Sequence, residues 1–78
     1  MTFITHLRHV PQSVRPRLKE LIARNLYRFT SEEDKEELFS IYNAYINTSI
    51  NPVKPSCARD CGKVLHFTGE YYKIRNEW

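Results

Sequence analysis

Residues 30–45 read TSEEDKEELFSIYNAY, and this stretch decides the fold. Thr30 and Glu33 have capping-box spacing, in which the hydroxyl and the carboxylate each accept a hydrogen bond from an otherwise unpaired backbone amide. The acidic residues at positions 32–34 also place negative charge at the positive end of the helix dipole. We therefore predict a helix that begins with Thr30 as its N-cap.

The second half of this helix is apolar. Its apolar residues recur at intervals of three or four and form one face: Leu38, Phe39, Ile41, Tyr42, Tyr45 and Ile46. This spacing is typical of a helix with one buried side. We expect the acidic start to be solvated and the apolar half to pack against the rest of the protein.

Another amphipathic helix precedes it. We predict that it runs from Ser13, as N-cap, to about Phe29, with Pro16 in the first turn, where the missing amide hydrogen costs no helical bond. Its apolar face consists of Val14, Leu18, Leu21, Ile22, Leu26 and Phe29. Because one helix ends where the next begins, we expect the two to meet at a sharp corner.

Arg17, Arg24 and Arg28 form a basic stripe along the border of that face. Residues 1–28 hold six basic and one acidic side chain, whereas residues 29–50 hold one basic and five acidic. The stripe can contact an acidic partner or phosphates, and we include its three arginines among the predicted partner-binding residues. Alternatively, the arginines pair with glutamates of the next helix. Those glutamates are Glu32, Glu36 and Glu37.

The last third of the chain admits two interpretations. Residues 47–55 are rich in turn formers and are predicted to be a loop. Residues 56–69 read as a helix with Ser56 as cap and Gly69 as its end, followed by an extended tail. A small β-hairpin across residues 63–75 is the alternative. We favour the helix because it places both cysteines on one face.

The predicted fold is mainly α, a small three-helix domain spanning residues 1–78, with an extended N-terminal arm and a short extended C-terminal tail. With 78 residues, the chain buries only about 60 % of the surface that its unfolded form exposes. We therefore expect a larger protein to cover apolar residues near both ends. These predicted partner-binding residues are Phe3, Ile4, Leu7, Tyr71, Tyr72, Ile74 and Trp78.

Cys57, Cys61 and His66 are the candidate metal ligands. Their Cys-x3-Cys-x4-His spacing supplies three of the four ligands of a structural zinc site, and His6 or His9 would supply the fourth. Buried free cysteines are the alternative interpretation. We expect no cofactor, with zinc as the alternative.

The sequence shows no nucleophile and base in a catalytic pattern and no glycine-rich phosphate loop, so an enzyme is not predicted.

The segments Ile41-Tyr42-Asn43 and Pro55-Ser56-Cys57, followed by Cys61, resemble a pattern in small proteins of tailed bacteriophages, especially those of Bacteroidetes hosts. There, an aromatic-Asn helix end leads through a Pro/Lys loop to a close cysteine pair. The resemblance covers the middle third of the chain, and three residues separate the cysteines here where two are more usual. It implies a virus-encoded component of the head or portal region.

The function that we expect is non-enzymatic protein–protein interaction, as an accessory structural subunit of a phage virion or capsid docked on a larger protein. Its expected location is the virion or the host cytoplasm, and we predict no membrane association. One alternative is a nucleic-acid-binding regulator, zinc-stabilised or not, that uses the basic helix and the aromatic tail on single strands. The other alternative is an inhibitor of a host enzyme.

Overall fold

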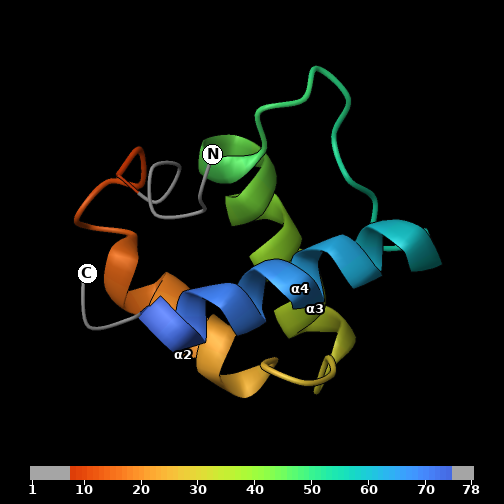
Figure 1. The fold of residues 1–78 in the computed structure, drawn as a ribbon, viewed down its shortest axis with the longest axis horizontal. Helices are drawn as coiled ribbons and strands as arrows, with labels where there is room; N and C mark the ends of the chain where they lie inside the picture. The colour runs from red at the N-terminus through yellow and green to blue at the C-terminus, as the bar shows by residue number, and fades with distance from the viewer. Residues whose placement is uncertain (1–7, 75–78) are drawn as a thin grey trace.

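Three α-helices and one short π-helical turn make up the fold of residues 8–74, which are the residues that the computed structural model describes (Figure 1). In chain order they are α2 (Arg15–Arg24), α3 (Glu32–Ile41), the π-helix η1 (Tyr42–Ile46) and α4 (Ala58–Ile74). These residues contain no β-strand. The prediction of a mainly α, three-helix fold is confirmed, and the predicted N-terminal arm, at residues 1–7, lies outside the described residues.

The start of α2 is shifted by one residue from its predicted position. Pro16 lies in the first turn as expected, but the N-cap is Val14 instead of Ser13 and makes no side-chain cap bond. The backbone amides of Val14 and Arg15 instead donate to the carbonyl of Pro11, at 3.0 and 3.1 Å. A backbone turn therefore leads the chain into the helix, in place of the predicted hydroxyl cap.

Asn25 ends α2 well before Phe29, so the predicted end is wrong. The Asn25 side chain is fully buried, at 0 % exposure. Its Nδ2 donates to the carbonyl oxygen of Leu21 at 2.8 Å, and its Oδ1 accepts from the amide of Thr30 at 2.9 Å. One side chain thus adds a second donor to a carbonyl that also accepts the Asn25 backbone amide, and satisfies an amide of the next segment. Residues 25–31 are consequently a hydrogen-bonded loop, not a corner without a linker.

The N-cap of α3 is Ser31, whose Oγ accepts from the amide of Asp34 at 3.1 Å. The predicted capping box of Thr30 with Glu33 is therefore wrong by one residue. The Thr30 hydroxyl instead lies 3.2 Å from the Asp34 carboxylate, to which it donates. The acidic first turn is present as predicted, with Glu32, Glu33 and Asp34 at the positive end of the helix dipole.

α4 is longer than predicted, and it replaces the alternative hairpin. The helix runs without interruption through Gly62 and Gly69, so the prediction that Gly69 ends it is wrong. Neither glycine has a positive φ, which is the backbone conformation that terminates helices. Tyr71 through Ile74 are helical, so the predicted extended tail is wrong for these residues, while residues 75–78 lie outside the described part. The predicted loop before the helix is confirmed.

The three helices share one hydrophobic core, with α4 crossing α2 and α3 in Figure 1. Two edge-to-face ring pairs join its parts: Phe29 with Phe39 at 5.5 Å, and Tyr42 with Phe67 at 5.4 Å between centroids. The second pair fixes η1 against α4. The buried apolar residues are Val10, Leu18, Leu21, Ile22, Leu38, Phe39, Ile46, Val53, Val64, Phe67 and Tyr71.

None of the described helices has the length and apolar character required to span a membrane.

Candidate binding surface at the loop between η1 and α4

The predicted metal ligands do not converge in the structure. Cys57 and Cys61 are half-buried free thiols at the start of α4, and the Cys61 Sγ donates to the carbonyl of Pro55 at 3.1 Å. His66 is exposed and follows Cys61 by five residues, which places it about 140° further around the helix. Across residues 8–74, no group of three or more His, Cys, Asp or Glu side chains is arranged to hold a metal ion.

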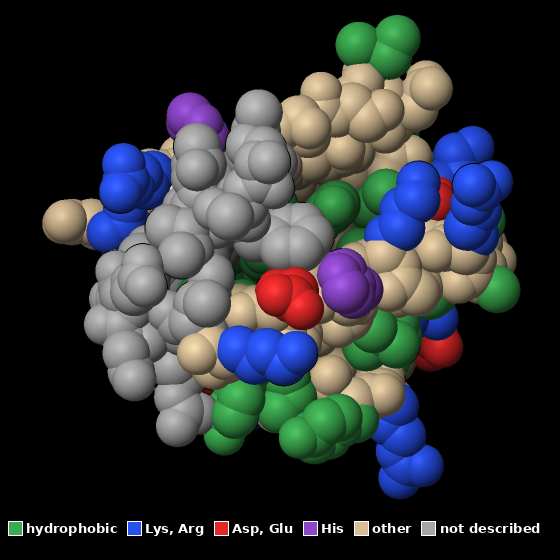
Figure 2. All heavy atoms as spheres, in the orientation of Figure 1, with side chains coloured by type: hydrophobic (Ala, Val, Ile, Leu, Met, Phe, Trp, Pro, Cys, Tyr) green, Lys and Arg blue, Asp and Glu red, His purple; other side chains and the backbone are tan. Residues whose placement is uncertain are grey.

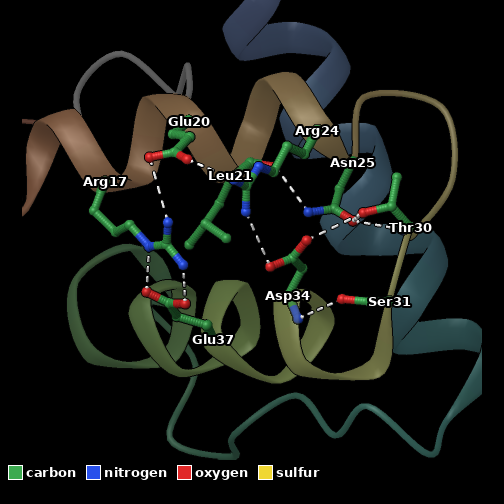
Figure 3. Close-up of polar contacts among 9 residues, drawn as sticks. All are labelled: Arg17, Glu20, Leu21, Arg24, Asn25, Thr30, Ser31, Asp34 and Glu37. Atoms are coloured by element: carbon green, nitrogen blue, oxygen red, sulfur yellow. Dashed lines mark hydrogen bonds and ion pairs between the residues drawn. The ribbon is translucent and has the colours of Figure 1, made fainter.

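Two arginines of the predicted basic stripe are bound within the molecule (Figure 3). The Nε and Nη2 atoms of Arg17 each lie 2.6 Å from an oxygen of Glu37, in a bidentate pair between α2 and α3. Arg24 lies 2.7 Å from Glu20 and 3.4 Å from Asp34. For these two arginines the structure favours the interpretation that the stripe pairs with acidic residues of the protein itself.

The Arg17–Glu37 pair changes the titration of both groups. Its hydrogen bonds hold the pKa of Glu37 below the ordinary value and raise the pKa of Arg17. Arg28, the third arginine of the stripe, is exposed and makes no hydrogen bond or ion pair with another described residue. Its positive charge is therefore not matched by the described part of the fold.

Of the apolar docking residues predicted near the chain ends, two have described side chains. Tyr71 is 3 % exposed and belongs to the protein's own core, where burial raises the pKa of its hydroxyl to about 12. Tyr72 is 40 % exposed on the same helix. The others, Phe3, Ile4, Leu7, Trp78 and the side chain of Ile74, lie outside the described part.

A groove of about 370 Å³ lies between the start of α2 and the α3–η1 segment. It is lined by Ser13, Val14, Arg17, Glu37, Ser40, Ile41, Ala44 and Tyr45. Its charged residues, Arg17 and Glu37, are bound to each other. The groove therefore offers a ligand no charged group that is still unmatched.

Ile50 is the most exposed large apolar residue of the described chain, at 96 %. It lies in the loop between η1 and α4, which projects from the helices at the top of Figure 1. Sequence reasoning treated this segment only as a connection and did not select Ile50. An isolated exposed apolar residue is common on protein surfaces, so its significance depends on how its loop is held.

Asn43 of η1 holds the returning end of this loop. Its Nδ2 donates to the carbonyl of Val53, and its Oδ1 accepts from the amide of Val53, both at 2.9 Å. The side-chain amide thereby satisfies both backbone groups of one residue, much as a neighbouring β-strand would. Since the Val53 side chain is also buried in the core, this end of the loop is fixed on both sides.

Further hydrogen bonds cross the loop near Ile50. Asn47 donates through Nδ2 to the Asn43 Oδ1 at 3.2 Å and to the carbonyl of Asn51 at 3.0 Å. The Asn47 Oδ1 accepts from the amide of Ser49 at 2.9 Å, and the Ser49 Oγ accepts from the amide of Asn51 at 3.2 Å. Ile50 thus lies between two residues whose backbone amides are bonded. We call residues 47–53 the Ile50 loop.

The π-helical turn η1 precedes the loop directly. The amide of Asn47 donates to the carbonyl of Tyr42 at 2.7 Å, a bond that spans five residues and defines the π-helix. Such turns are rare and are found frequently at functional sites. The apolar periodicity of residues 38–46 does not distinguish a π-turn from an α-turn. The sequence does contain one indication of the side-chain hydrogen bonds in this loop, because Asn43, Asn47 and Asn51 recur every four residues.

Basic side chains follow the Ile50 loop. Lys54, Arg59 and Lys63 are exposed, and Figure 2 shows Lys and Arg side chains gathered over the start of α4. The nearby Asp60 accepts a hydrogen bond from the amide of Lys54 at 3.0 Å and lies 3.8 Å from the Lys63 Nζ. The hydrogen bond ties the end of the loop to the first turn of α4. We call these three basic residues the α4 basic cluster.

The candidate site is therefore a convex binding surface formed by the Ile50 loop and the α4 basic cluster. Comparison of the chain with protein-family models, curated proteins and solved structures finds no match. The functional argument accordingly depends on the contacts, exposure and charge of this surface.

Proposed function

We propose that this protein is a non-enzymatic docking protein that anchors itself to a larger protein through the Ile50 loop. The observation that carries this proposal is an isoleucine, 96 % exposed, on a loop held by hydrogen bonds from asparagine side chains. Full burial of such a side chain stabilises a complex by about 1.5–3 kcal/mol. Because Ile50 is almost fully exposed in the free protein, nearly all of this gain is available on binding.

The hydrogen bonds of the loop reduce the entropy lost on binding. Fixing the backbone of one flexible residue costs about 1–2 kcal/mol. In this loop, the side chains of Asn43 and Asn47 already restrict the backbone before a partner arrives. More of the free energy of Ile50 burial therefore contributes to affinity. Polar neighbours surround the isoleucine, as in interfaces with an apolar centre and a polar rim.

The charge of the segment favours a protein over a nucleic acid as the direct contact of Ile50. Residues 38–53 contain no Asp, Glu, Lys or Arg. Nucleic-acid binding depends on positive side chains that neutralise phosphates, and the apex of the loop provides none. A concave apolar pocket on a protein matches a single projecting aliphatic side chain.

The larger assembly that we propose is a phage particle, with this chain as an accessory subunit on a head or portal protein. The support is the resemblance of segments between residues 41 and 61 to small proteins of tailed phages. Quantitative mass spectrometry of purified particles tests this assignment. The expected result is a fixed number of copies per portal or capsid protein, whereas absence from washed particles contradicts it.

The docking role is tested by comparing Ile50→Asp with the matched control Tyr27→Asp. Tyr27 is also highly exposed, at 88 %, but belongs to the segment between α2 and α3, which lies at the bottom of Figure 1, away from the Ile50 loop at the top. In affinity purification from the native host, the wild type and the Tyr27 variant should retain the same partner, and the Ile50 variant should lose it. Circular dichroism should show that all three proteins fold. Equal recovery of the partner by the Ile50 variant would refute the proposal.

A further inference from the structure

We infer that the pocket receiving Ile50 is bordered by acidic side chains of the partner protein, which bind the α4 basic cluster. This inference rests on the proposed docking function. It identifies the chemistry of the partner from the surface that surrounds the anchor. The supporting observations are the charge of Lys54, Arg59 and Lys63, their exposure, and their position after the Ile50 loop.

The charges of this cluster are not balanced by the described part of the fold. Three basic side chains stand beside one carboxylate, Asp60, which already accepts the amide of Lys54. Its ion pair with Lys63 is long, at 3.8 Å, and Arg59 has no hydrogen bond or ion pair among the described residues. Between α2 and α3 the situation differs, because Arg17 and Arg24 each contact two carboxylates.

The position of the cluster is unfavourable for the isolated helix. Arg59 lies in the first turn of α4, where the helix dipole favours negative charge. Lys63 follows Arg59 by four residues, and like charges at this spacing repel each other on a helix. Carboxylates of a partner would relieve both effects, since they are attracted by the side chains and by the helix N-terminus.

The loop that carries the anchor is bonded to the helix that carries Arg59 and Lys63. Asn43 holds Val53, and Asp60 holds the next residue, Lys54, so the end of the Ile50 loop is bonded to η1 and to α4. An isoleucine in a pocket and three cations at its border can therefore engage one partner at the same time. Border charges of this kind mainly accelerate association and make it dependent on salt.

The test uses the full-length chain with the photoreactive amino acid benzoylphenylalanine in place of Ile50, expressed in the native host and irradiated. A second set adds Arg59→Gln and Lys63→Gln. The matched control set adds Arg8→Gln and Lys73→Gln, which remove the same charge from exposed residues outside the cluster. Crosslinked peptides are identified by mass spectrometry, and crosslink yields are compared in lysates at low and high salt.

We expect one principal crosslinked site, on a protein surface with several Asp or Glu residues around the attached atom. At low salt the Arg59/Lys63 set should lose yield about fivefold or more, and the control set should match the parent. High salt should lower the parent yield to that of the Arg59/Lys63 set. Equal yields in both double-variant sets, a site without acidic residues, or crosslinks to nucleic acid overturn the inference.

The two proposals fail in different ways. A single crosslinked protein site whose yield does not depend on Arg59 and Lys63 leaves the docking function intact and refutes the acidic border. Crosslinks scattered over many unrelated proteins, or no crosslink in a folded protein, refute the docking function and with it the inference. Circular dichroism of each purified variant establishes that it is folded.

Discussion

Replacing Gly62 and Gly69 with alanine should stabilise the protein. Both glycines lie within α4, where each costs up to about 1 kcal/mol relative to alanine because glycine loses more backbone freedom on folding. A Cβ added at either position meets no atom within 4 Å, and neither residue has a positive φ. Alanine therefore removes the entropic cost without introducing a clash or backbone strain.

The expected gain is about 0.5–1 kcal/mol for each substitution. The two positions are seven residues apart and share no packing partner, so the gains should add to roughly 1–2 kcal/mol. For a domain of this size, 1 kcal/mol corresponds to about 4–8 °C in Tm. The double variant should consequently melt roughly 4–16 °C above the wild type.

Urea unfolding followed by circular dichroism at 222 nm measures these gains. The proteins compared are the wild type, Gly62→Ala, Gly69→Ala and the double variant, with unchanged m-values showing that only stability has changed. Gly62→Thr is the control, because threonine has a lower helix propensity than alanine and should stabilise less. Loss of stability in either alanine variant would show that the position is crowded or not helical, and would refute the reasoning.

Four further predictions concern the polar and titrating residues. Asn25→Ala should lower the free energy of unfolding by about 1–3 kcal/mol, measured in urea, because the Thr30 amide loses its hydrogen-bond partner and the buried Leu21 carbonyl loses one of its two donors; no change contradicts this. Asn43→Ala should speed hydrogen exchange in the Ile50 loop, measured by mass spectrometry. Protection equal to that of the wild type would contradict a role of the Asn43–Val53 hydrogen bonds in holding the loop. Because the pKa of Tyr71 is raised to about 12 in the folded state from 10.0, its contribution is complete below pH 10 and is lost as the pH rises toward 12. This loss reaches roughly 3 kcal/mol, and Tyr71→Phe should remove it from the measured pH dependence of unfolding. The lowered pKa of Glu37 gives the opposite dependence, since its contribution is present above the unfolded pKa of about 4.3 and is lost as the pH falls through the folded value. Glu37→Gln should therefore reduce the loss of unfolding free energy at acid pH, measured by urea unfolding at several pH values. An unchanged pH dependence contradicts the ion pair.

The helices could be predicted because apolar residues recur at the helical period over ten or more positions in each case. The end of α2 could not, because Leu26 and Phe29 continue the same period beyond it. At the end of the helix, a buried side-chain amide accepts a hydrogen bond from the amide of Thr30, and the residue pattern does not show that contact. In sequence, Asn25 is simply a residue of low helix propensity.

α4 continues past Gly69, although a glycine at this point of the sequence favours the end of a helix. Gly69 costs the helix about 1 kcal/mol. Phe67 and Tyr71, on either side of it, are both buried at helical spacing, and each contributes about 1.5–3 kcal/mol by leaving water. Core packing therefore outweighs the local preference for a break. The sequence shows the glycine and the two aromatic residues, but not that both rings are buried in the same core.

The binding surface was the hardest part to predict, because the sequence shows the type of a side chain but not whether the fold already uses it. The arginines of α2 are conspicuous in the sequence, yet Arg17 and Arg24 are bound to carboxylates within the protein. Arg59 and Lys63 attract less notice, and they lie in the first turns of α4, to which the end of the Ile50 loop is bonded. The isoleucine of that loop is almost fully exposed. A charge can attract a partner strongly only where folding has left it unmatched, and an apolar side chain gains from binding only where folding has left it in water. Both conditions are met at the junction of the Ile50 loop and α4. They are also met after α2, by the exposed Tyr27 and by Arg28, a single cation that no described residue matches. We assign docking to the Ile50 loop and α4 because Ile50 is the more exposed of the two side chains, asparagine side chains hold its loop, and three basic residues follow it.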